Sequence, residues 1–510
     1  GYKEERFIIN NTKFSEMEKE LEYIYKHQKE VTILGEATGV LGWDQQTYMP
    51  KKGLAARAEQ CALLDSLIHE KFIDKKFFSA VKKAKTKKLP FDQKRMIDLL
   101  YKDISKSRKL PTTFVEELSR TVTLAHPAWE EAREKSKFSV FQPHLEKIVK
   151  LKQKQCQYIK VKGHPYNSLL DDYEEGMTAE KIKPAFEKVK KGIMELLHRI
   201  KSSSRYKNQK PLSLPNVPKE VQLAMCKDVA QRMGLTDDVS RMDLAMHPFT
   251  THLGSDDTRI TTNIREHPMF SFGSTVHESG HALYDMQLPK KYAYTTLRNA
   301  PSMGLHESQS RFWENMIGKS KPFWQFYFPK LKQAWKLPVT EEQWYRDINY
   351  VTPGMIRIET NEIHYGLHII LRFEMELGLM DGSIKVKDLP QLWNAKMKDL
   401  FGITPRNDKE GVLQDVHWSG GSFGYFPTYT LGTIYASQLY AAMKRKIPNI
   451  EDDIRQGNYT RIREWLLENV HKHGNLYQAE DVIKKVCGEG LNPNMYIKYL
   501  TDKYTALYEC

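Results

Sequence analysis

Apolar residues recur every three or four positions along most of the chain, which is the spacing of an amphipathic helix. The first such stretch follows Ser15 and Glu18, a capping-box pair, and continues through Leu21, Ile24 and Tyr25. The same spacing predicts further helices at about 92–107, 113–122, 142–161, 179–200, 219–233, 361–377, 389–400, 429–444 and 460–471. Most of the chain is therefore predicted to be helical.

Alternating patterns typical of strands are rare, and the best example lies within residues 247–264. There, Thr258, Ile260 and Thr262 occupy alternate positions after a turn-prone run of serine and aspartate. We expect a small sheet of two or three strands. The segment 202–218 is rich in serine and proline, which break helices, and it predicts a loop or a seam between two helical lobes.

The composition is that of a folded protein rather than a fibrous or disordered one. Hydrophobic residues make up 40% of the 510 positions and aromatic residues 11%, which is enough for a large core. The 28 glycines and 23 prolines follow no repeating period, which excludes collagen-like and low-complexity chains. No apolar run approaches the roughly 18 residues of a membrane span, and the mean hydropathy is -0.60. We therefore expect a soluble protein that does not enter a membrane.

The net charge of +14 would suit an acidic partner if the positive residues gathered on one surface. Most of them are scattered, and the densest run, within 82–88, is typical of a helix end that meets solvent. We therefore expect no nucleic-acid partner. The five cysteines are far apart and show no CxxC spacing, which indicates neither a disulfide framework nor a thiolate metal site. A reducing compartment fits this pattern best, so we expect a cytoplasmic protein.

The strongest chemical signal is the run from His277 to His281, in which two histidines flank a glutamate and two small residues. On a helix, His277 and His281 project from the same face, so both imidazoles can bind one zinc ion while Glu278 deprotonates the attacking water. Apolar neighbours favour a helix here, and Ser274 is a suitable residue to cap it. The alternative is a surface helix with two solvated histidines.

A catalytic zinc site needs a third protein ligand. A third histidine six residues after His281 would complete one known arrangement, but Gln287 occupies that position. Another arrangement takes a glutamate from a later helix, and Glu307, 26 residues after His281, lies where a helical pattern starts. We favour Glu307 over Glu314 as the third ligand. Asp285 lies one turn beyond His281 and could instead be a carboxylate that holds a ligand imidazole.

Several motifs, taken in order along the chain, resemble those of the carboxypeptidase Taq family of zinc metallopeptidases. One of these motifs is the HExxH run at 277–281. Another is the family's IRxEAD segment, from which the chain departs only at Thr360 and Asn361, which replace Ala and Asp. Similar segments near residues 43–50 and 463–471 extend the resemblance over nearly the whole chain. The other matching motifs are HPF at 247–249, DxRxT at 257–261, HESQ at 306–309, IRxE at 356–359 and GxxQDxHW at 411–418.

The resemblance implies a mainly α-helical, two-lobed metallopeptidase with a deep active-site groove and a small β-sheet near the site. Residues 1–510 would form one catalytic domain, and the protein would be a homodimer that removes single residues from the free C-termini of peptides. One divalent metal ion per chain is implied, Zn2+ in the first place with Co2+ as the alternative. The resemblance assigns this ion to His277, His281 and Glu307.

A carboxypeptidase must recognise a free α-carboxylate, and a planar guanidinium does so with two charge-assisted hydrogen bonds. Arg259 and Arg357 are the candidates. Either could equally be a structural ion-pair partner, because Asp256 and Glu359 lie close to them in sequence. By analogy with the family, the loops that carry His247 and Arg259 close one end of the groove and limit what is accepted beyond the scissile bond.

A second hydrogen-bond donor is needed for the negative charge that develops on the carbonyl oxygen during hydrolysis. His417 and Tyr425 are the best candidates, because both lie in a glycine-rich loop that could close over bound substrate. The alternative is that His417 is bonded to Asp415 and that Tyr425 belongs to the core.

These residues support the hypothesis that Glu278 takes a proton from the attacking water and passes it to the leaving amine. Two other functions stay open. An endo-oligopeptidase could use the same zinc chemistry on internal bonds and would need no carboxylate clamp. A basic protein that binds nucleic acid or another acidic partner would instead show tight, salt-sensitive binding.

Overall fold

A computed structural model of the protein describes residues 16–214 and 216–510. The chain divides into two compact units. The first holds the residues up to Arg108 together with Lys291–Arg298, and the second holds Lys109–Lys290 and Asn299–Cys510. The segment 202–218, which we considered as a seam between lobes, lies inside the second unit. That the whole chain acts as one catalytic domain stays a prediction.

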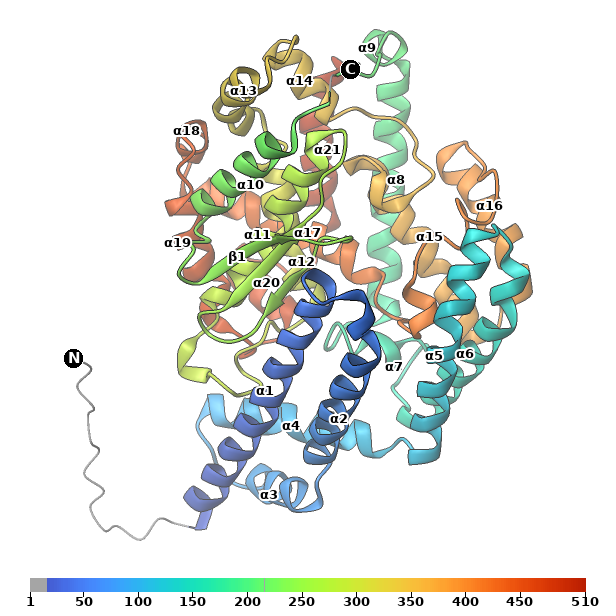
Figure 1. The fold of residues 1–510 in the computed structure, drawn as a ribbon, viewed down its shortest axis with the longest axis vertical. Helices are drawn as coiled ribbons and strands as arrows, with labels where there is room; N and C mark the ends of the chain where they lie inside the picture. The colour runs from blue at the N-terminus through green and yellow to red at the C-terminus, as the bar shows by residue number, and fades with distance from the viewer. Residues whose placement is uncertain (1–15, 215) are drawn as a thin grey trace, which may run out of the picture. The chain divides into compact units, whose positions relative to one another are not determined.

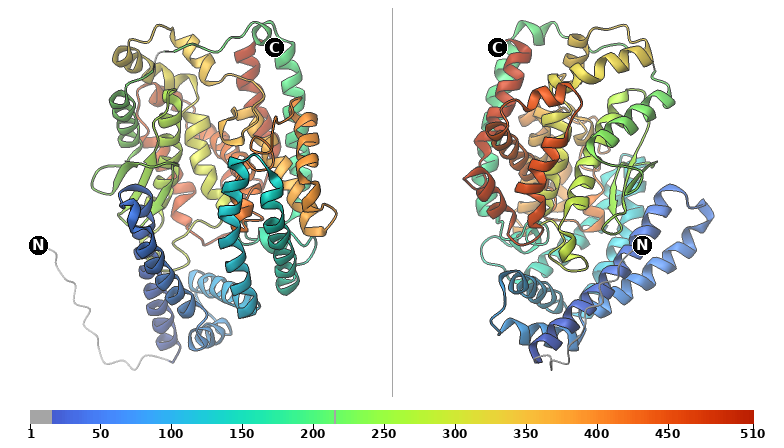
Figure 2. Two further views of the ribbon diagram at one scale, coloured as in Figure 1. Left: turned by 45° about the vertical axis from the view of Figure 1, so that its right-hand side comes forward. Right: turned by 90° about the vertical axis from the view of Figure 1, so that its left-hand side faces the viewer.

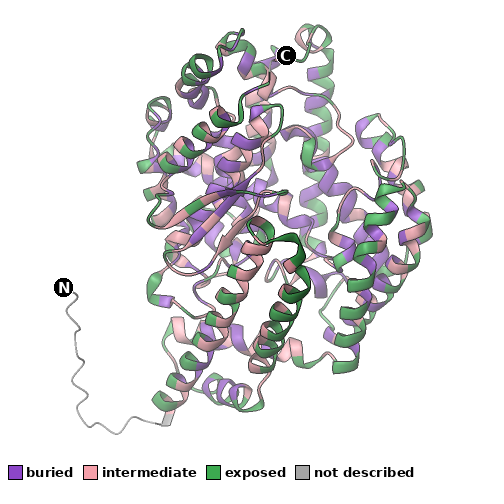
Figure 3. Ribbon diagram, in the orientation of Figure 1, coloured by how far each residue is buried: buried purple, intermediate pink, exposed green. Residues whose placement is uncertain are grey.

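The first unit is helical, and its core is formed by α1, α3 and α4, where Ile24, Val81 and Ile104 are completely buried. None of the residues of α2 is buried, and Figure 3 shows most of this helix as exposed. The predicted cap of the first helix, Ser15, lies outside the described residues. The helices of this unit are α1 (Glu16–Thr47), α2 (Leu54–Phe72), α3 (Lys75–Lys85) and α4 (Phe91–Arg108).

The basic run within 82–88 falls at the end of α3, which stops at Lys85. Nζ of Lys83 lies 2.8 Å from Glu20, and Nζ of Lys85 lies 2.7 Å from Asp98. Both acids belong to the same unit, so two of the lysines at this helix end are paired with acids of the first unit.

The second unit holds the remaining helices and one small sheet, which packs against α11 (Figure 1). The predicted mainly α class is confirmed. Among the described residues, no helix is both long enough and apolar enough to cross a membrane. The helices are α5 (Thr112–Glu134), α6 (Phe138–Ile159), α7 (Asn167–Leu170), α8 (Ala179–Ser202), α9 (Ser204–Lys207), α10 (Lys219–Met233), α11 (Pro268–Gln287), α12 (Met303–Arg311), α13 (Lys321–Trp335), α14 (Glu341–Ile348), α15 (Glu362–Asp381), α16 (Leu389–Phe401), α17 (Pro427–Lys446), α18 (Ile450–Arg455), α19 (Thr460–Asn469), α20 (Ala479–Cys487) and α21 (Pro493–Tyr508).

The sheet has three strands in the order β1-β3-β2. They are β1 (Ser240–Leu244), β2 (Thr250–His252) and β3 (Thr258–Thr262), with β3 parallel to β1 and antiparallel to β2. Strand β1 lies before the window in which we expected strands. The sequence pattern did not predict it, because β1 is mostly polar and becomes a strand through its parallel pairing with β3. Figure 2 shows the strands beside α11, which contacts both β2 and β3.

Helix α11 carries the His277–His281 run and begins earlier than the sequence suggested. Its N-cap is His267, whose Nδ1 accepts a hydrogen bond from the backbone N–H of Met269, and Pro268 occupies the first helical position. The prediction that Ser274 caps the helix is wrong, since that hydroxyl donates to the carbonyl of Ser271 within the helix. The early start gives the His277–His281 run two full turns of helix on its N-terminal side.

Two glycines allow the helices around the site to approach closely. A Cβ on Gly280 of α11 would lie 2.7 Å from the backbone oxygen of Gln309 on α12. A Cβ on Gly432 of α17 would lie 2.8 Å from Cβ of Glu307. Helix α12 is therefore held between α11 and α17 at a distance that larger residues would not permit.

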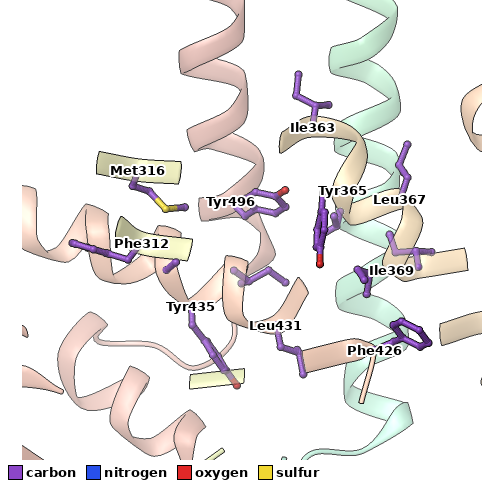
Figure 4. Close-up of a cluster of buried hydrophobic side chains, with 14 of the residues drawn as sticks. Phe312, Met316, Ile363, Tyr365, Leu367, Ile369, Phe426, Leu431, Tyr435 and Tyr496 are labelled. Atoms are coloured by element: carbon purple, nitrogen blue, oxygen red, sulfur yellow. The ribbon is translucent and has the colours of Figure 1, made fainter. Parts of the chain in front are cut away.

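A buried hydrophobic cluster joins several helices of the second unit. Figure 4 shows side chains from α12 and its continuation, α15, α17 and α21 meeting in this cluster. Tyr496 and Leu431 are each exposed by 1% or less, and α21 and α17, which carry them, pack against one another. The labelled members are Phe312, Met316, Ile363, Tyr365, Leu367, Ile369, Phe426, Leu431, Tyr435 and Tyr496.

A buried carboxyl group, Glu174, caps the start of α12. It accepts a hydrogen bond from the backbone N–H of Gly304 and lies beside Ser302, the N-cap residue of that helix. Burial raises the pKa of Glu174 from its ordinary value of 4.5 to about 8, although these hydrogen bonds oppose the shift. The folded protein therefore keeps a proton on Glu174 over a pH range in which the unfolded chain has lost it.

This proton makes stability depend on pH. Because the native state binds the proton between about pH 4.5 and 8, the free energy of unfolding should fall as pH rises through this range, by up to about 1.4 kcal/mol per pH unit from this group. Glu174→Gln cannot titrate, yet its amide oxygen can still accept from Gly304, so its urea midpoint should fall less between pH 5 and pH 8. An exposed control on α8, Glu195→Gln, should match the wild type, and an unchanged decline in Glu174→Gln would contradict the assignment.

Candidate metal centre and substrate groove

Two helices bring three metal-ligating atoms together. His277 and His281 lie one turn apart on α11, and Glu307 lies on α12, which packs against α11. Oε2 of Glu307 is 3.8 Å from Nε2 of His277 and 3.2 Å from Nε2 of His281. The three donor atoms all lie within 4.8 Å of one another. Two imidazoles and one carboxylate are a donor set typical of catalytic zinc, so these residues fit a divalent metal ion.

Glu314 lies on the opposite side of the His277 ring, in a π-helical turn (Phe312–Ile317) that continues α12. Nδ1 of His277 donates a hydrogen bond to Oε2 of Glu314 at 2.7 Å. Burial disfavours an ionised Glu314, yet His277 holds the pKa of this carboxyl at about 2. Burial by itself would lower the pKa of His277, but Glu307 and Glu314 raise it to about 9. Glu314 thus orients His277 from outside the donor set.

The other histidine, His281, has a different outer partner. Its Nδ1 lies 2.5 Å from Nδ1 of His306 on α12. Nε2 of His306 lies 2.7 Å from Oδ1 of Asp285. Asp285 therefore holds a ligand imidazole only through a second histidine, which the sequence alone did not indicate.

The two carboxylate oxygens of Glu307 have different partners. Oε2 faces the histidines, whereas Oε1 accepts a hydrogen bond from Nε of Arg311 at 2.7 Å. Burial would raise the pKa of Glu307, but the Arg311 guanidinium and the two imidazoles lower it far below its ordinary range. Glu307 is therefore ionised, with one oxygen oriented toward the position between the histidines.

Glu278 is held by the neighbouring edge strand. The hydroxyl of Thr250 on β2 lies 2.6 Å from Oε2 of Glu278 and 3.0 Å from its backbone oxygen. The residue is largely buried, and its side chain lines the main groove beside His277. This is the position that a general base next to a metal site requires.

The groove has a volume of about 1090 Å³ and lies entirely within the second unit. His277, Glu278 and Glu307 line it together with His247 and Arg357, so the metal site and two of the expected substrate-binding residues share one cavity. The lining also includes Arg311, Tyr365 and Tyr429, which sequence reasoning did not select. Their positions follow from the folding of α12, α15 and α17 around the cavity, and no local motif marks them.

Arg357 is held at the groove wall by buried partners. Its Nε and Nη2 donate to Oδ1 of Asp415 at 3.0 and 2.8 Å, and its Nη1 donates to the hydroxyl of Tyr365 at 2.8 Å. Asp415 also accepts from the buried Arg372. Burial would raise the pKa of Asp415, but the two guanidinium groups lower it far below its ordinary range. Arg357 has three of its five N–H groups engaged, which leaves one on each terminal nitrogen.

Arg259 has a different environment. Its Nε and Nη2 donate to the two carboxylate oxygens of Asp257 at 2.8 and 2.7 Å. It lies on β3 and is not among the described residues that line the main groove. Arg259 is therefore part of an ion pair, as the alternative interpretation predicted, and its partner is Asp257 rather than Asp256.

The glycine-rich loop is fixed to α15 through Glu376. Trp418 Nε1 donates to one carboxylate oxygen at 2.8 Å, and the N–H of Gly424 donates to the other at 3.0 Å. His417 directly precedes the first anchor and Tyr425 directly follows the second, and neither is among the described groove-lining residues. Nε2 of His417 is 3.3 Å from the hydroxyl of Tyr429, which does reach the groove.

The departure from the family pattern at Asn361 has a structural explanation. Asn361 is the N-cap of α15, where its side-chain oxygen accepts from the N–H of His364 at 3.1 Å. Asp and Asn are nearly equivalent at this position of a helix. The replacement therefore preserves the start of the helix that carries Glu376 and Arg372.

Comparisons with known proteins identify the family of the chain. The chain matches the family described as Carboxypeptidase Taq (M32) metallopeptidase over residues 23–504. It is 37% identical to thermostable carboxypeptidase 1 of Pyrococcus furiosus over 491 residues, 95% of this chain and 98% of that protein. It is also 37% identical to carboxypeptidase 1 of Bacillus subtilis over 501 residues, 94% of this chain and 97% of that protein. A solved structure of the Pyrococcus furiosus carboxypeptidase covers 96% of this chain and 99% of its own, with a TM-score of 0.92 and 37% identity. The chain therefore belongs to the carboxypeptidase Taq family of metallopeptidases and is a metallocarboxypeptidase.

Proposed function

We propose that the protein is a zinc-dependent carboxypeptidase that uses His277, His281 and Glu307 as metal ligands and removes single residues from peptide C-termini. The observation that carries this proposal is the convergence of three donor atoms from two helices, with two of the three residues, His277 and Glu307, lining a large groove. A bound zinc ion would supply a Lewis acid that activates water for attack on the scissile carbonyl. Cobalt is the alternative ion, since the same donor set accepts both.

The chain's own residues handle the proton. Glu278 accepts it from the attacking water and passes it to the nitrogen of the leaving residue, which departs as a free amino acid. The hydroxyl of Thr250 at 2.6 Å keeps the carboxylate oriented toward the groove during this transfer. The developing negative charge on the carbonyl oxygen needs a hydrogen-bond donor, for which we propose His417 and Tyr425.

The protonation states of these two donors support their role. Burial lowers the pKa of His417 to about 4, so that its imidazole is neutral at pH 7. Burial also raises the pKa of the Tyr425 hydroxyl, which therefore stays protonated. Both can donate a hydrogen bond without carrying charge. Tyr429, whose hydroxyl lies 3.3 Å from Nε2 of His417, lines the groove and connects His417 to it.

Arg357 is the residue that we propose for binding the substrate carboxylate, with His247 at the groove wall as a further contact. The two unengaged N–H groups of Arg357 form the end of a guanidinium fork, which matches the two oxygens of a carboxylate. Asp415 and Tyr365 fix the plane of this fork, so little conformational entropy is lost on binding.

Arg357→Ala should lower kcat/KM for a free-acid peptide by about 10- to 150-fold, because a charge-assisted hydrogen bond is worth about 1.5–3 kcal/mol. Most of this loss should appear in KM. The matched control is Arg259→Ala, which removes an arginine bound to Asp257 on β3 and should change kcat/KM much less. The reverse order of effects, measured with the same peptide, would transfer the role to Arg259.

Metal identity can be tested directly. Protein stripped with a chelator should lose hydrolysis of a short free-acid peptide and regain it with one equivalent of Zn2+ per chain. Restoration by Co2+ but not by Zn2+ would contradict the assignment of zinc.

Two broader properties complete the proposal. The cysteines are thiols rather than disulfides in the described residues, which supports a cytoplasmic location. The resemblance to the family supports a homodimer, for which sedimentation should give twice the chain mass of 59.6 kDa. An endo-oligopeptidase is the main alternative, and the carboxylate-binding fork of Arg357 argues against it.

A further inference from the structure

Three side chains form a line that runs outward from the metal site. His281 and Asp285 lie one turn apart on α11, and His306 reaches between them from the first turns of α12. Nδ1 of His306 is 2.5 Å from Nδ1 of His281, and Nε2 of His306 is 2.7 Å from Oδ1 of Asp285. The centres of the two imidazole rings are 4.7 Å apart, so the rings meet edge to edge through these nitrogens.

Only one arrangement of protons satisfies this line when both histidines are neutral. An ionised carboxylate can only accept, so Nε2 of His306 must carry the hydrogen that it donates to Asp285. Nδ1 of His306 then has a lone pair and must accept from Nδ1–H of His281. His281 is left with a lone pair on Nε2, which is the nitrogen that lies 3.2 Å from Oε2 of Glu307.

We propose that His306 is a positioning residue that transmits the orienting effect of Asp285 to His281 and so fixes Nε2 as its metal-binding nitrogen. The proposal rests on the ligand set proposed above. It gives His306 a role distinct from that of its neighbour Glu307, even though the two residues are adjacent on α12. It also makes Asp285 act on the metal site through an intermediate histidine and not by contact.

The two ligand histidines are therefore oriented in different ways. Glu314 contacts His277 directly at 2.7 Å, whereas Asp285 reaches His281 only through His306. Aromatic rings pack against the connection from Asp285 through His306 to His281. The ring centre of Tyr284 lies 5.2 Å from that of His306 and 4.7 Å from that of the buried His471. Both connections place a carboxylate behind the ring of a proposed ligand, which increases the basicity of the ligand nitrogen.

The test measures the Zn2+ dissociation constant of the full-length protein by competition with a chelator. His306→Leu removes the connection and should weaken Zn2+ binding by about 10- to 100-fold. His306→Gln can still accept from His281 and donate to Asp285, so it should remain within about threefold of the wild type. Equal losses in the Leu and Gln variants, or wild-type affinity in His306→Leu, would overturn the proposal.

A double-variant cycle separates transmission from a direct effect of charge. Asp285→Asn should weaken Zn2+ binding in the wild-type background but have no further effect in the His306→Leu background. An equal effect in both backgrounds would show that Asp285 acts without His306.

The outcome distinguishes this proposal from the ligand assignment itself. If the wild type binds Zn2+ and His277→Ala does not, the ligand set stands and the cycle decides the role of His306. If His277→Ala binds Zn2+ as the wild type does, the proposed ligand set is wrong and the role of His306 falls with it. Thermal unfolding of the metal-free variants verifies that each has folded.

Discussion

Glu278→Gln is expected to lower kcat by about 10²- to 10⁴-fold while one metal ion per chain stays bound. The amide keeps the size of the side chain and can still hydrogen-bond to Thr250, which lies 2.6 Å from the present carboxylate. It cannot accept the proton of the attacking water. Because Glu278 is not among the three residues whose donor atoms converge, the metal should remain in place.

The measurement combines metal content with steady-state kinetics on one free-acid peptide. KM should change little, since the substituted group acts on the water and not on the peptide carboxylate. Substantial turnover in a Glu278→Gln protein with full metal content would exclude Glu278 as the general base. Loss of the metal would instead move Glu278 into the ligand set.

Glu307→Gln is expected to abolish stable metal retention, whereas Glu314→Gln should weaken it by only about 10- to 100-fold. Both glutamates lie beside His277, Glu307 at Nε2 and Glu314 at Nδ1. Only Glu307 faces the nitrogens of both histidines. A neutral amide at Glu307 would also leave the charge of Arg311 without the partner at 2.7 Å.

The two variants form a matched pair, because they make the same chemical change on the same stretch of helix. Zn2+ dissociation constants should rank wild type, Glu314→Gln and Glu307→Gln from tightest to weakest. Full metal content in Glu307→Gln, with loss in Glu314→Gln, would exchange the roles of the two residues and contradict the geometry described here.

The helical fold and the centre of the site were accessible from sequence because both depend on local periodicity. The spacing of His277 and His281 fixes them on one face of a helix, whatever surrounds it. The boundaries of α10 (Lys219–Met233) agree with the predicted range for the same reason. The strand pattern at Thr258–Thr262 was recognisable because β3 is central and mostly buried.

The remaining features depend on tertiary contacts that leave no local pattern. Strand β1 is mostly polar and is defined by its pairing with β3. Arg357 becomes the better candidate for binding the substrate carboxylate only in the folded chain, where Asp415, 58 residues away in sequence, lies beside it. The partners of His281 likewise depend on the close approach of α12, which Gly280 permits.

The most direct test of the central claim compares hydrolysis of one short peptide with a free C-terminus and of the same peptide with an amidated C-terminus. Each reaction is run with metal, with a chelator, and with Zn2+ added back. We expect the protein to shorten only the free acid, one residue at a time, with activity lost in chelator and restored by Zn2+. Equal cleavage of both peptides at internal bonds, or no cleavage of either by metal-loaded protein, would contradict the account.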